Sequence, residues 1–319
     1  MLISDPLNDS FDKKATRDGY GAALVEVGKS QPKVVVLEAD LSGSTKTGMF
    51  AKEFPDRFYN FGVAEQNMVG HAAGLSRTGL IPFASSFAMF LTGRAWEVVR
   101  NSIAYPEENV KLVATHAGIT LGEDGASHQI IEDIGIMRVI PGMTVIVPAD
   151  YAQTFAAVKA AAEFNGPVYI RLGRPGIPVI YDQNEKYEIG KGHVLQEGKD
   201  IAFVATGIMV FEAWKAAKLL EKEKGIRPHV INISSIKPLD VDLLKKVAGQ
   251  VNRMYTFEEH NIMGGLGSAV TEALSEETNL SITRIGIDDT FGQSGTVSAL
   301  MDHYGLTAEK LVERIGKEI

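Results

Sequence analysis

The chain has 319 residues, and at about 150 residues per domain this length predicts two domains. Its 45% apolar and 23% charged residues are typical of a globular protein. Its net charge of −8 disfavours non-specific binding of nucleic acid, so we expect no nucleic-acid partner, and local basic residues must bind any anionic ligand. The sequence has no cysteine, which excludes disulfides, thiolate nucleophiles and cysteine-bound metals. It also has no apolar run of membrane-spanning or signal-peptide character, so we expect a soluble protein of the cytoplasm without a membrane partner.

Apolar, β-branched runs alternate with amphipathic segments in the first half of the chain. This alternation predicts βα units and a mostly parallel sheet covered by helices. The expected strands are 33–40, 57–63, 80–84, 111–116, 144–148 and 167–172. The expected helices between them include 16–29, 66–78, 87–103 and 151–164.

The pattern breaks over residues 173–200, which are rich in Gly, Pro and charged residues, and then resumes. The second half is expected to hold strands near 201–207, 229–233, 253–257 and 282–287, and helices near 211–224, 241–247, 267–274 and from 307 onward. The sequence therefore predicts an α/β protein of two domains, residues 1–178 and 194–319, each with a mostly parallel sheet flanked by helices. Residues 179–193 are expected to link them.

Three side chains near expected strand ends are candidates for a ligand site. Glu65 begins an expected helix, where the helix dipole favours an acid, but this is also the sheet edge at which doubly wound folds bind ligands. Phe87 and Phe90 follow the next strand with a spacing that fits either core packing or a ring-stacking surface. Arg94, further along, is expected to be a surface charge.

The loop THAGITLGEDGASHQIIED, which follows the strand at 111–116, is the most informative segment. His116, Asp124 and His128 could serve acid–base chemistry or contact oxygen atoms, although glycines and acids also build ordinary turns. A zinc site is disfavoured because the histidines lack metal-binding spacing and no thiolate is available. The sequence also lacks a P-loop, a G-x-S-x-G elbow and a strand followed by G-x-G-x-x-G.

Basic, acidic and hydroxyl side chains at the ends of other elements could complete the site. Each one alone is typical of a helix cap or a surface charge. If the loops converge, Arg, Ser and His side chains would bind a phosphate group in an otherwise acidic protein. These residues are Arg17, Asp40, Ser44 and Arg174.

Taken together, these motifs resemble the transketolase family in order and spacing. The family's pyrimidine-binding domain is similar to FGVAEQNM, PFASSFAMF, THAGITLGEDGASHQ, VIVPAD and YIRLGRP, and its C-terminal domain to INISSIKPLD, TFEEHNIMGGLGS and GIDDTFGQSG. A complete transketolase also has a diphosphate-binding domain with a Gly-Asp-Gly motif, and this chain contains no such motif. The resemblance implies one half of a split transketolase that needs a separate N-terminal diphosphate-binding subunit, with two copies of each chain.

The resemblance also implies a cofactor, thiamine diphosphate, with Mg²⁺ held mainly by the partner subunit and no metal ligand in this chain. Glu65 would hydrogen-bond the aminopyrimidine and so promote deprotonation at C2 of the thiazolium. Phe87 and Phe90 would pack against the pyrimidine ring, and Asp40 would lie near the cofactor.

For the substrate, the resemblance implies transfer of a two-carbon ketol unit from a ketose phosphate to an aldose phosphate. His128 would contact the C1 hydroxyl or carbonyl oxygen of the donor, as a second catalytic residue beside Glu65. Asp124 would bind a sugar hydroxyl. The sugar phosphate would be held by Arg17, Ser44, His116 and Arg174.

Three alternatives remain open at this point. The β subunit of a 2-oxoacid dehydrogenase decarboxylating component has the same two-domain layout, but the Arg, Ser and His set fits a sugar phosphate better than a small 2-oxoacid. A half resembling deoxyxylulose-phosphate synthase is a further alternative, although such enzymes carry both halves in one chain. A non-catalytic scaffold subunit is disfavoured because Glu65, Asp124 and His128 are all present.

Overall fold

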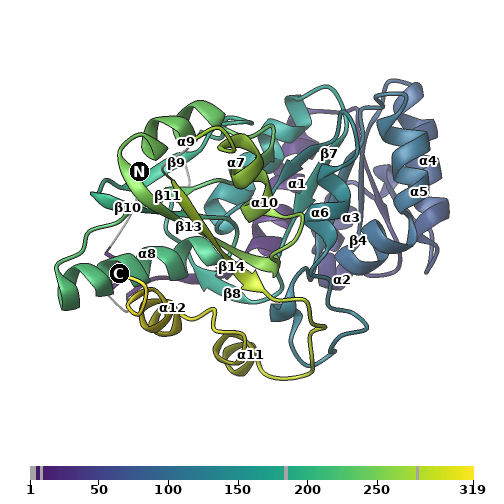
Figure 1. The fold of residues 1–319 in the computed structure, drawn as a ribbon. Helices are drawn as coiled ribbons and strands as arrows, with labels where there is room; N and C mark the ends of the chain where they lie inside the picture. Colours follow the sequence, from purple (N-terminus) through teal and green to yellow (C-terminus); the bar gives the residue numbers. More distant parts are fainter. Residues whose placement is uncertain (1–4, 8–9, 183–185, 278–279) are drawn as a thin grey trace.

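The computed structural model describes residues 5–7, 10–182, 186–277 and 280–319. Its larger sheet, to which the strands β4 and β7 of Figure 1 belong, has the order β12-β6-β7-β5-β4-β2-β3, and every neighbouring pair is parallel except β12 with β6. Six of these strands come from the first half of the chain: β2 (Val34–Glu38), β3 (Phe58–Asn60), β4 (Ile81–Phe87), β5 (Lys111–Thr115), β6 (Thr144–Ile146) and β7 (Val168–Arg171).

Helices cover both faces of this sheet. Successive residues of β2 enter different cores, because side chains alternate across a strand: Val34 packs among residues of α1 and α7, and Val35 among residues of α4. The continuous apolar run VVVL in β2 follows from this burial on both faces. The helices of the first half are α1 (Thr16–Ser30), α2 (Ser42–Thr45), α3 (Gly48–Glu53), α4 (Glu65–Arg77), α5 (Trp96–Val98), α6 (Asp133–Arg138) and α7 (Tyr151–Glu163).

The second half of the chain builds a smaller sheet in the order β14-β13-β10-β11-β9, in which only β9 is antiparallel to its neighbour. Its strands are β9 (His193–Gln196), β10 (Asp200–Ala205), β11 (His229–Asn232), β13 (Val251–Asn261) and β14 (Ser281–Ile287). Its helices are α8 (Met209–Lys224), α9 (Val241–Ala248), α10 (Leu266–Ala273), α11 (Val297–His303) and α12 (Ala308–Ile315). Among the described residues, no helix is long and apolar enough to cross a bilayer.

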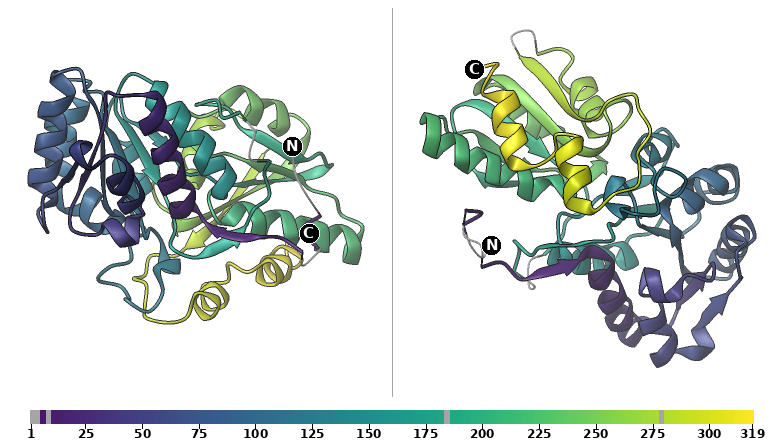
Figure 2. Two further views of the ribbon diagram at one scale, coloured as in Figure 1. Left: turned by 180° about the vertical axis from the view of Figure 1, so that it is seen from behind. Right: turned by 90° about the horizontal axis from the view of Figure 1, so that it is seen from below.

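The two halves are joined through shared structure as well as through the linker. Strand β12 (Ser235–Lys237) belongs to the second half but pairs with β6 at the edge of the larger sheet. Within the first half, β1 (Lys13–Ala15) pairs with β8 (Gly176–Pro178). One hydrophobic core contains side chains from both halves, and Figure 2 shows them lying against each other along one side. Loops at this junction are therefore held by contacts with both halves of the chain.

The fold class predicted from the sequence, with mostly parallel sheets flanked by helices, is confirmed. The helix expected over 87–103 is wrong in detail. Phe87 is the last residue of β4, where it pairs with Thr115 of β5, so tertiary pairing extends the strand beyond its apolar run. The helical part that follows is broken into π-helical turns at Met89–Arg94 and Val99–Ala104 on either side of α5.

Candidate active site

The candidate residues lie where parallel strands of the larger sheet end. Asp40 follows β2, Phe87 ends β4, His116 follows β5 and Arg174 follows β7. Because these strands are neighbours in the sheet, their carboxyl ends form one edge. Asp40 and His116 both have left-handed backbone conformations, with φ of 65° and 62°, which non-glycine residues adopt mainly where surrounding structure requires a sharp change of direction.

Glu65 is the first residue of α4 and is 1% exposed. Arg94 Nη1 donates to Glu65 Oε2 at 2.7 Å, while 48% of the Arg94 side chain is exposed. The guanidinium also lies over the Phe90 ring, 4.9 Å from its centroid. Arg94 therefore links the buried carboxylate to an aromatic ring, and the expectation that Arg94 is only a surface charge is wrong.

Two aromatic residues and two histidines form a stacked group beside this ion pair. The rings of Phe87 and Phe90 are stacked with centroids 6.1 Å apart. Phe87 also stacks on His116 at 3.8 Å, and Phe90 meets the edge of His128 at 5.4 Å. The spacing of Phe87 and Phe90 therefore places both rings against the candidate polar residues.

His116 is held as a neutral ring in one tautomer. Arg17 Nη1 lies 3.2 Å from Nε2, and because a guanidinium only donates, Nε2 must accept. The ring proton is then on Nδ1, which is 2.7 Å from Thr115 Oγ1. Burial, reinforced by the charges of Arg17, Arg174 and Lys46, lowers the pKa of His116 to about 3. A neutral His116 surrounded by three cations is a favourable environment for an anionic group.

The loop after β2 is anchored by a buried carboxylate, Glu38. Its Oε2 accepts from the hydroxyls of Thr45 at 2.7 Å and Thr47 at 2.6 Å, and its Oε1 accepts from Ala39 N–H at 3.1 Å. Burial raises the pKa of Glu38 to about 7. The same loop contains Ser44, whose carbonyl oxygen accepts from Arg17 Nη1 at 3.0 Å. Glu38 thus fixes the segment against which Arg17 is oriented.

The loop that follows β5 carries the remaining candidates. Arg174 Nη1 donates to Leu121 O at 2.5 Å and pairs with Glu123 at 3.3 Å. His128 is half-buried, with Nδ1 3.0 Å from Ser127 Oγ, whereas Asp124 is exposed on a glycine-bounded turn. Gln129 holds the loop closed by donating to Ile119 O at 3.0 Å, Gly122 O at 3.3 Å and Gln293 O at 3.0 Å.

Not every candidate joins one cluster. Asp40 is exposed and exchanges hydrogen bonds with Asn60, at 3.0 and 3.1 Å. Sequence reasoning missed Lys46 and Glu38, and it misread Arg94. The spacing of Arg94 from Phe90, one helical turn, was the signal that could have linked them. Within the described ranges, no three His, Asp or Glu side chains are grouped to hold a metal.

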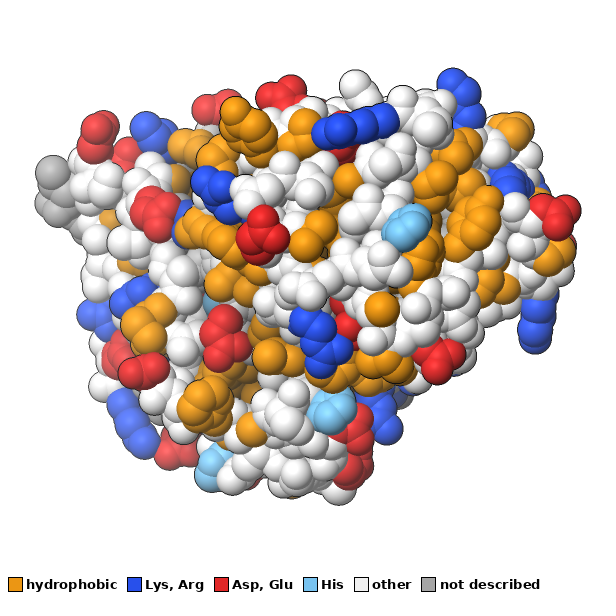
Figure 3. All heavy atoms as spheres, turned by 90° about the vertical axis from the view of Figure 1, so that its right-hand side faces the viewer, with side chains coloured by type: hydrophobic (Ala, Val, Ile, Leu, Met, Phe, Trp, Pro, Cys, Tyr) orange, Lys and Arg blue, Asp and Glu red, His pale blue; other side chains and the backbone are white. Residues whose placement is uncertain are grey.

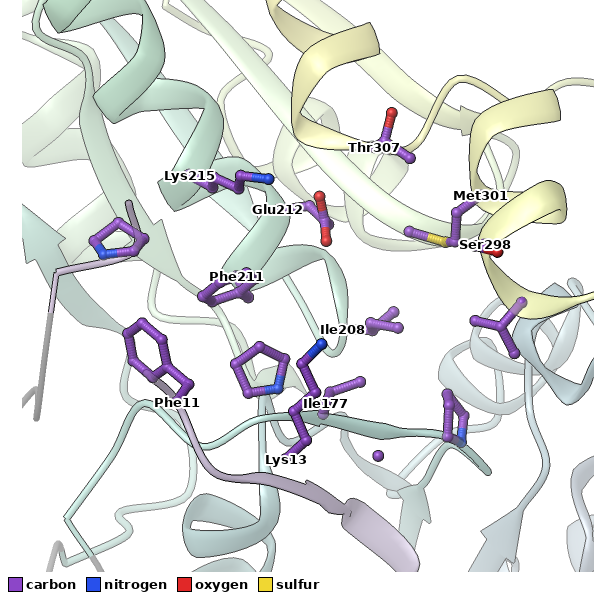
Figure 4. Close-up of a pocket in the computed structure, with 15 residues that line it drawn as sticks. Phe11, Lys13, Ile177, Ile208, Phe211, Glu212, Lys215, Ser298, Met301 and Thr307 are labelled. Atoms are coloured by element: carbon purple, nitrogen blue, oxygen red, sulfur yellow. The ribbon is translucent and has the colours of Figure 1, made fainter. Parts of the chain in front are cut away.

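A separate cleft of about 750 Å³ lies between the N-terminal segment and the second half (Figure 4). Its walls are mainly apolar, including Phe11, Ile208 and Phe211, with Lys13 and Glu212 among its polar lining residues. None of the predicted site residues lines it. The chemical groups described above therefore lie outside this cleft, at the carboxyl edge of the larger sheet.

The face that carries α4 and α5 includes a band of apolar side chains (Figure 3). Exposed apolar residues near the candidate site include Val63 at 74%, Tyr59 at 42% and Met49 at 41%. Exposed large apolar side chains near a site are candidates for contact with a partner protein.

Comparison with known proteins identifies the family. The transketolase pyrimidine binding domain matches residues 12–178, and the transketolase C-terminal domain matches residues 190–311. The chain belongs to the transketolase family. A transketolase relative from Methanocaldococcus jannaschii, named for a C-terminal section, is 53% identical over 309 residues, covering 96% of each chain.

Two further members of the transketolase family are informative. A 6-deoxy-6-sulfo-D-fructose transketolase subunit from a Clostridium species is 39% identical over 310 residues, covering 97% of this chain and 96% of the relative. A solved structure of a split gene transketolase, an inactive β4 tetramer, is 54% identical with a TM-score of 0.88 and covers 96% of this chain and 98% of its own.

The transketolase family uses thiamine diphosphate, and the residues present fit the aminopyrimidine end of that cofactor. Glu65 supplies a buried carboxylate able to hydrogen-bond a ring nitrogen. Phe87 and Phe90 supply stacked rings against which a flat heterocycle can pack. No acidic cluster suited to Mg²⁺ occurs in the described part of the chain.

Proposed function

We propose that the chain is the pyrimidine-binding and C-terminal subunit of a thiamine diphosphate-dependent transketolase that transfers a two-carbon ketol unit from a ketose phosphate to an aldose phosphate. The observation that carries this proposal is the group of three cations, Arg17, Lys46 and Arg174, around neutral His116. This group meets Phe87, whose ring stacks on His116. A phosphate site thus adjoins an aromatic surface suited to the cofactor.

When bound, thiamine diphosphate supplies a nucleophilic carbon and an electron sink. Glu65 would hydrogen-bond the pyrimidine nitrogen N1′, and the burial of its carboxylate would strengthen that bond. Because Arg94 pairs with Glu65 in the chain alone, cofactor binding requires this guanidinium to share the carboxylate or to move. The exposed half of Arg94 leaves it room to do so.

On the substrate side, His128 orients the donor oxygen atoms, and Asp124 accepts from a sugar hydroxyl. Arg17, Ser44 and Arg174 contact the phosphate group, and His116 belongs to the same site. His116 Nε2 has no proton in the present arrangement, so its role is to hold the Arg17 guanidinium in place, and Arg17 and Arg174 provide the charge. Asp40, two residues beyond β2, would lie near the cofactor.

A separate N-terminal subunit completes the enzyme, in a complex with two copies of each chain. Two findings support this part of the proposal. A relative from Methanocaldococcus jannaschii that is named for a transketolase C-terminal section matches 96% of this chain and 96% of its own length, and a relative 54% identical in sequence forms a β4 tetramer described as inactive. The exposed apolar residues near the site are a suitable surface for such a partner.

The test is a reconstitution. The chain is co-expressed with a candidate partner that carries the Gly-Asp-Gly motif, and the complex is supplied with thiamine diphosphate and Mg²⁺. Xylulose 5-phosphate with ribose 5-phosphate, a 6-sulfonated ketose with the same acceptor, and pyruvate with an electron acceptor are assayed in parallel. Turnover of the phosphorylated pair supports the proposal. A strict preference for the sulfonate, or turnover of pyruvate alone, contradicts it.

A further inference from the structure

One buried carboxylate of the C-terminal domain contacts the loop that carries the candidate phosphate-binding groups. Glu259, near the end of β13, is 3% exposed. Its Oε1 accepts from the backbone N–H of Thr120 at 2.6 Å, across 139 positions of sequence. Its carboxylate also lies directly against Gly118, where a Cβ atom would collide with it. The carboxylate therefore contacts the loop at two points, one polar and one steric.

The position of Glu259 is itself rigidly set. Arg171 Nη2 donates to the Glu259 carbonyl oxygen at 2.9 Å, and Arg171 Nε donates to Asp133 Oδ2 at 2.8 Å. Tyr169 donates to the same Asp133 oxygen at 2.6 Å. All four side chains are buried, and they come from β7, α6 and β13, so both domains hold this group in place.

The anchored loop leads straight to the proposed phosphate site. His116 lies two residues before Gly118, and the Leu121 carbonyl that receives the Arg174 guanidinium lies one residue after Thr120. Gly118 has a φ of 78°, a conformation that glycine adopts without strain. A shift of the 118–120 backbone would therefore move the attachment points of both His116 and Arg174.

We propose that Glu259 is a positioning residue for substrate phosphate: its carboxylate fixes the 116–121 loop and so holds His116 and Arg174 in their relative positions. This inference rests on the proposed function and assigns a role in the reaction to the C-terminal domain. Because Glu259 acts through the loop, its loss weakens binding of the phosphate end and leaves the chemistry at the ketol end largely intact.

The neighbouring residue provides a matched control. Glu258 is also fully buried, but its carboxylate accepts from Leu266 N–H at 2.7 Å and Gly267 N–H at 2.8 Å, at the start of α10. It therefore serves the C-terminal domain itself. Substitutions at Glu258 and Glu259 perturb equally buried carboxylates on one strand, and only the second reaches the loop.

The experiment compares E259D, E259Q, E258D and E258Q in the complex with the diphosphate-binding partner. E259D keeps the charge but is one methylene too short to reach Thr120, whereas E259Q keeps the reach and an accepting oxygen. For E259D we expect KM for ribose 5-phosphate to rise about tenfold, the size of one lost hydrogen bond to a charged group, with kcat nearly unchanged. KM for ribose without phosphate should not change. E259Q should restore the wild-type KM, and both Glu258 variants should keep it.

A second readout needs no partner. In the isolated chain, the Thr120 amide should exchange with deuterium faster in E259D than in wild type, and at the wild-type rate in E258D. The inference is overturned if E259D leaves KM for the phosphorylated acceptor unchanged, or changes KM for ribose and ribose 5-phosphate by the same factor. A wild-type complex without any ketol transfer would instead refute the proposed function, and the exchange experiment would still test the anchoring of the loop.

Discussion

Replacing Glu38 by Gln should make the stability of this chain less dependent on pH. Glu38 is fully buried, and burial raises its pKa from an ordinary value of 4.5 to about 7 in the folded chain. Between these two values the folded chain keeps a proton that the unfolded chain has lost. Stability therefore falls as pH rises through this window, and the loss is complete above about pH 7.

The size of the effect follows from the same two pKa values. A rise from pH 5 to pH 8 lowers the free energy of unfolding of the wild-type chain by about 2.5 kcal/mol through Glu38 alone. This follows from about 1.36 kcal/mol for each pKa unit. Gln has no charge to bury, and the hydroxyls of Thr45 and Thr47 can both donate to its oxygen and accept from its amide. The free energy of unfolding of Glu38→Gln minus that of wild type should therefore be about 2.5 kcal/mol larger at pH 8 than at pH 5.

Urea unfolding of the isolated chain at pH 5 and pH 8, followed by circular dichroism, measures this difference. Other buried acids contribute equally to both proteins, so the difference between wild type and variant isolates Glu38. Glu53→Gln, at an exposed position, is the control and should show no such change. Equal pH slopes for wild type and Glu38→Gln would refute the reasoning.

Three further outcomes follow from the site and its surroundings. Glu65→Gln in the assembled enzyme should lower kcat by about 100-fold or more, the scale of proton-transfer catalysis, whereas Arg77→Met on the exposed face of α4 should not; equal activities would contradict the role of Glu65. Arg17→Met should raise KM for phosphorylated sugars about tenfold and leave unphosphorylated ones nearly unchanged, measured in the same assay; a uniform effect would exclude a phosphate contact. Lys111→Met should lower the free energy of unfolding by about 3 kcal/mol in urea, because three oxygen atoms in partly or fully buried hydrogen bonds lose their donor; a loss below about 1 kcal/mol would show that water replaces it.

The strands and longer helices could be predicted because their patterns are local. The run VVVL of β2 and the helical pattern expected over 151–164, which is observed as α7, indicate their elements without any tertiary information. Strand β12 could not be predicted, because Ser235–Lys237 has only three residues and becomes a strand by pairing with β6. Phe87 likewise joins β4 through its pairing with β5.

The candidate site shows the same division. Residues at strand ends, such as His116 and Arg174, could be predicted because parallel strands present their carboxyl ends at one edge. The spacing of Arg94 from Phe90 could have linked those two residues, but the ion pair of Arg94 with Glu65, 29 positions away, follows from no local pattern. Glu259 lies 139 positions from Thr120, its hydrogen-bond partner, and no local pattern links them. Contacts between the two domains can be identified only from the folded structure.

Formation of sedoheptulose 7-phosphate from xylulose 5-phosphate and ribose 5-phosphate, by this chain with and without its diphosphate-binding partner, tests the central claim most directly. The proposed function predicts product only when both chains, thiamine diphosphate and Mg²⁺ are present. Product from this chain alone would contradict the split site, and absence of product from a stable two-chain complex loaded with cofactor would contradict the assigned reaction.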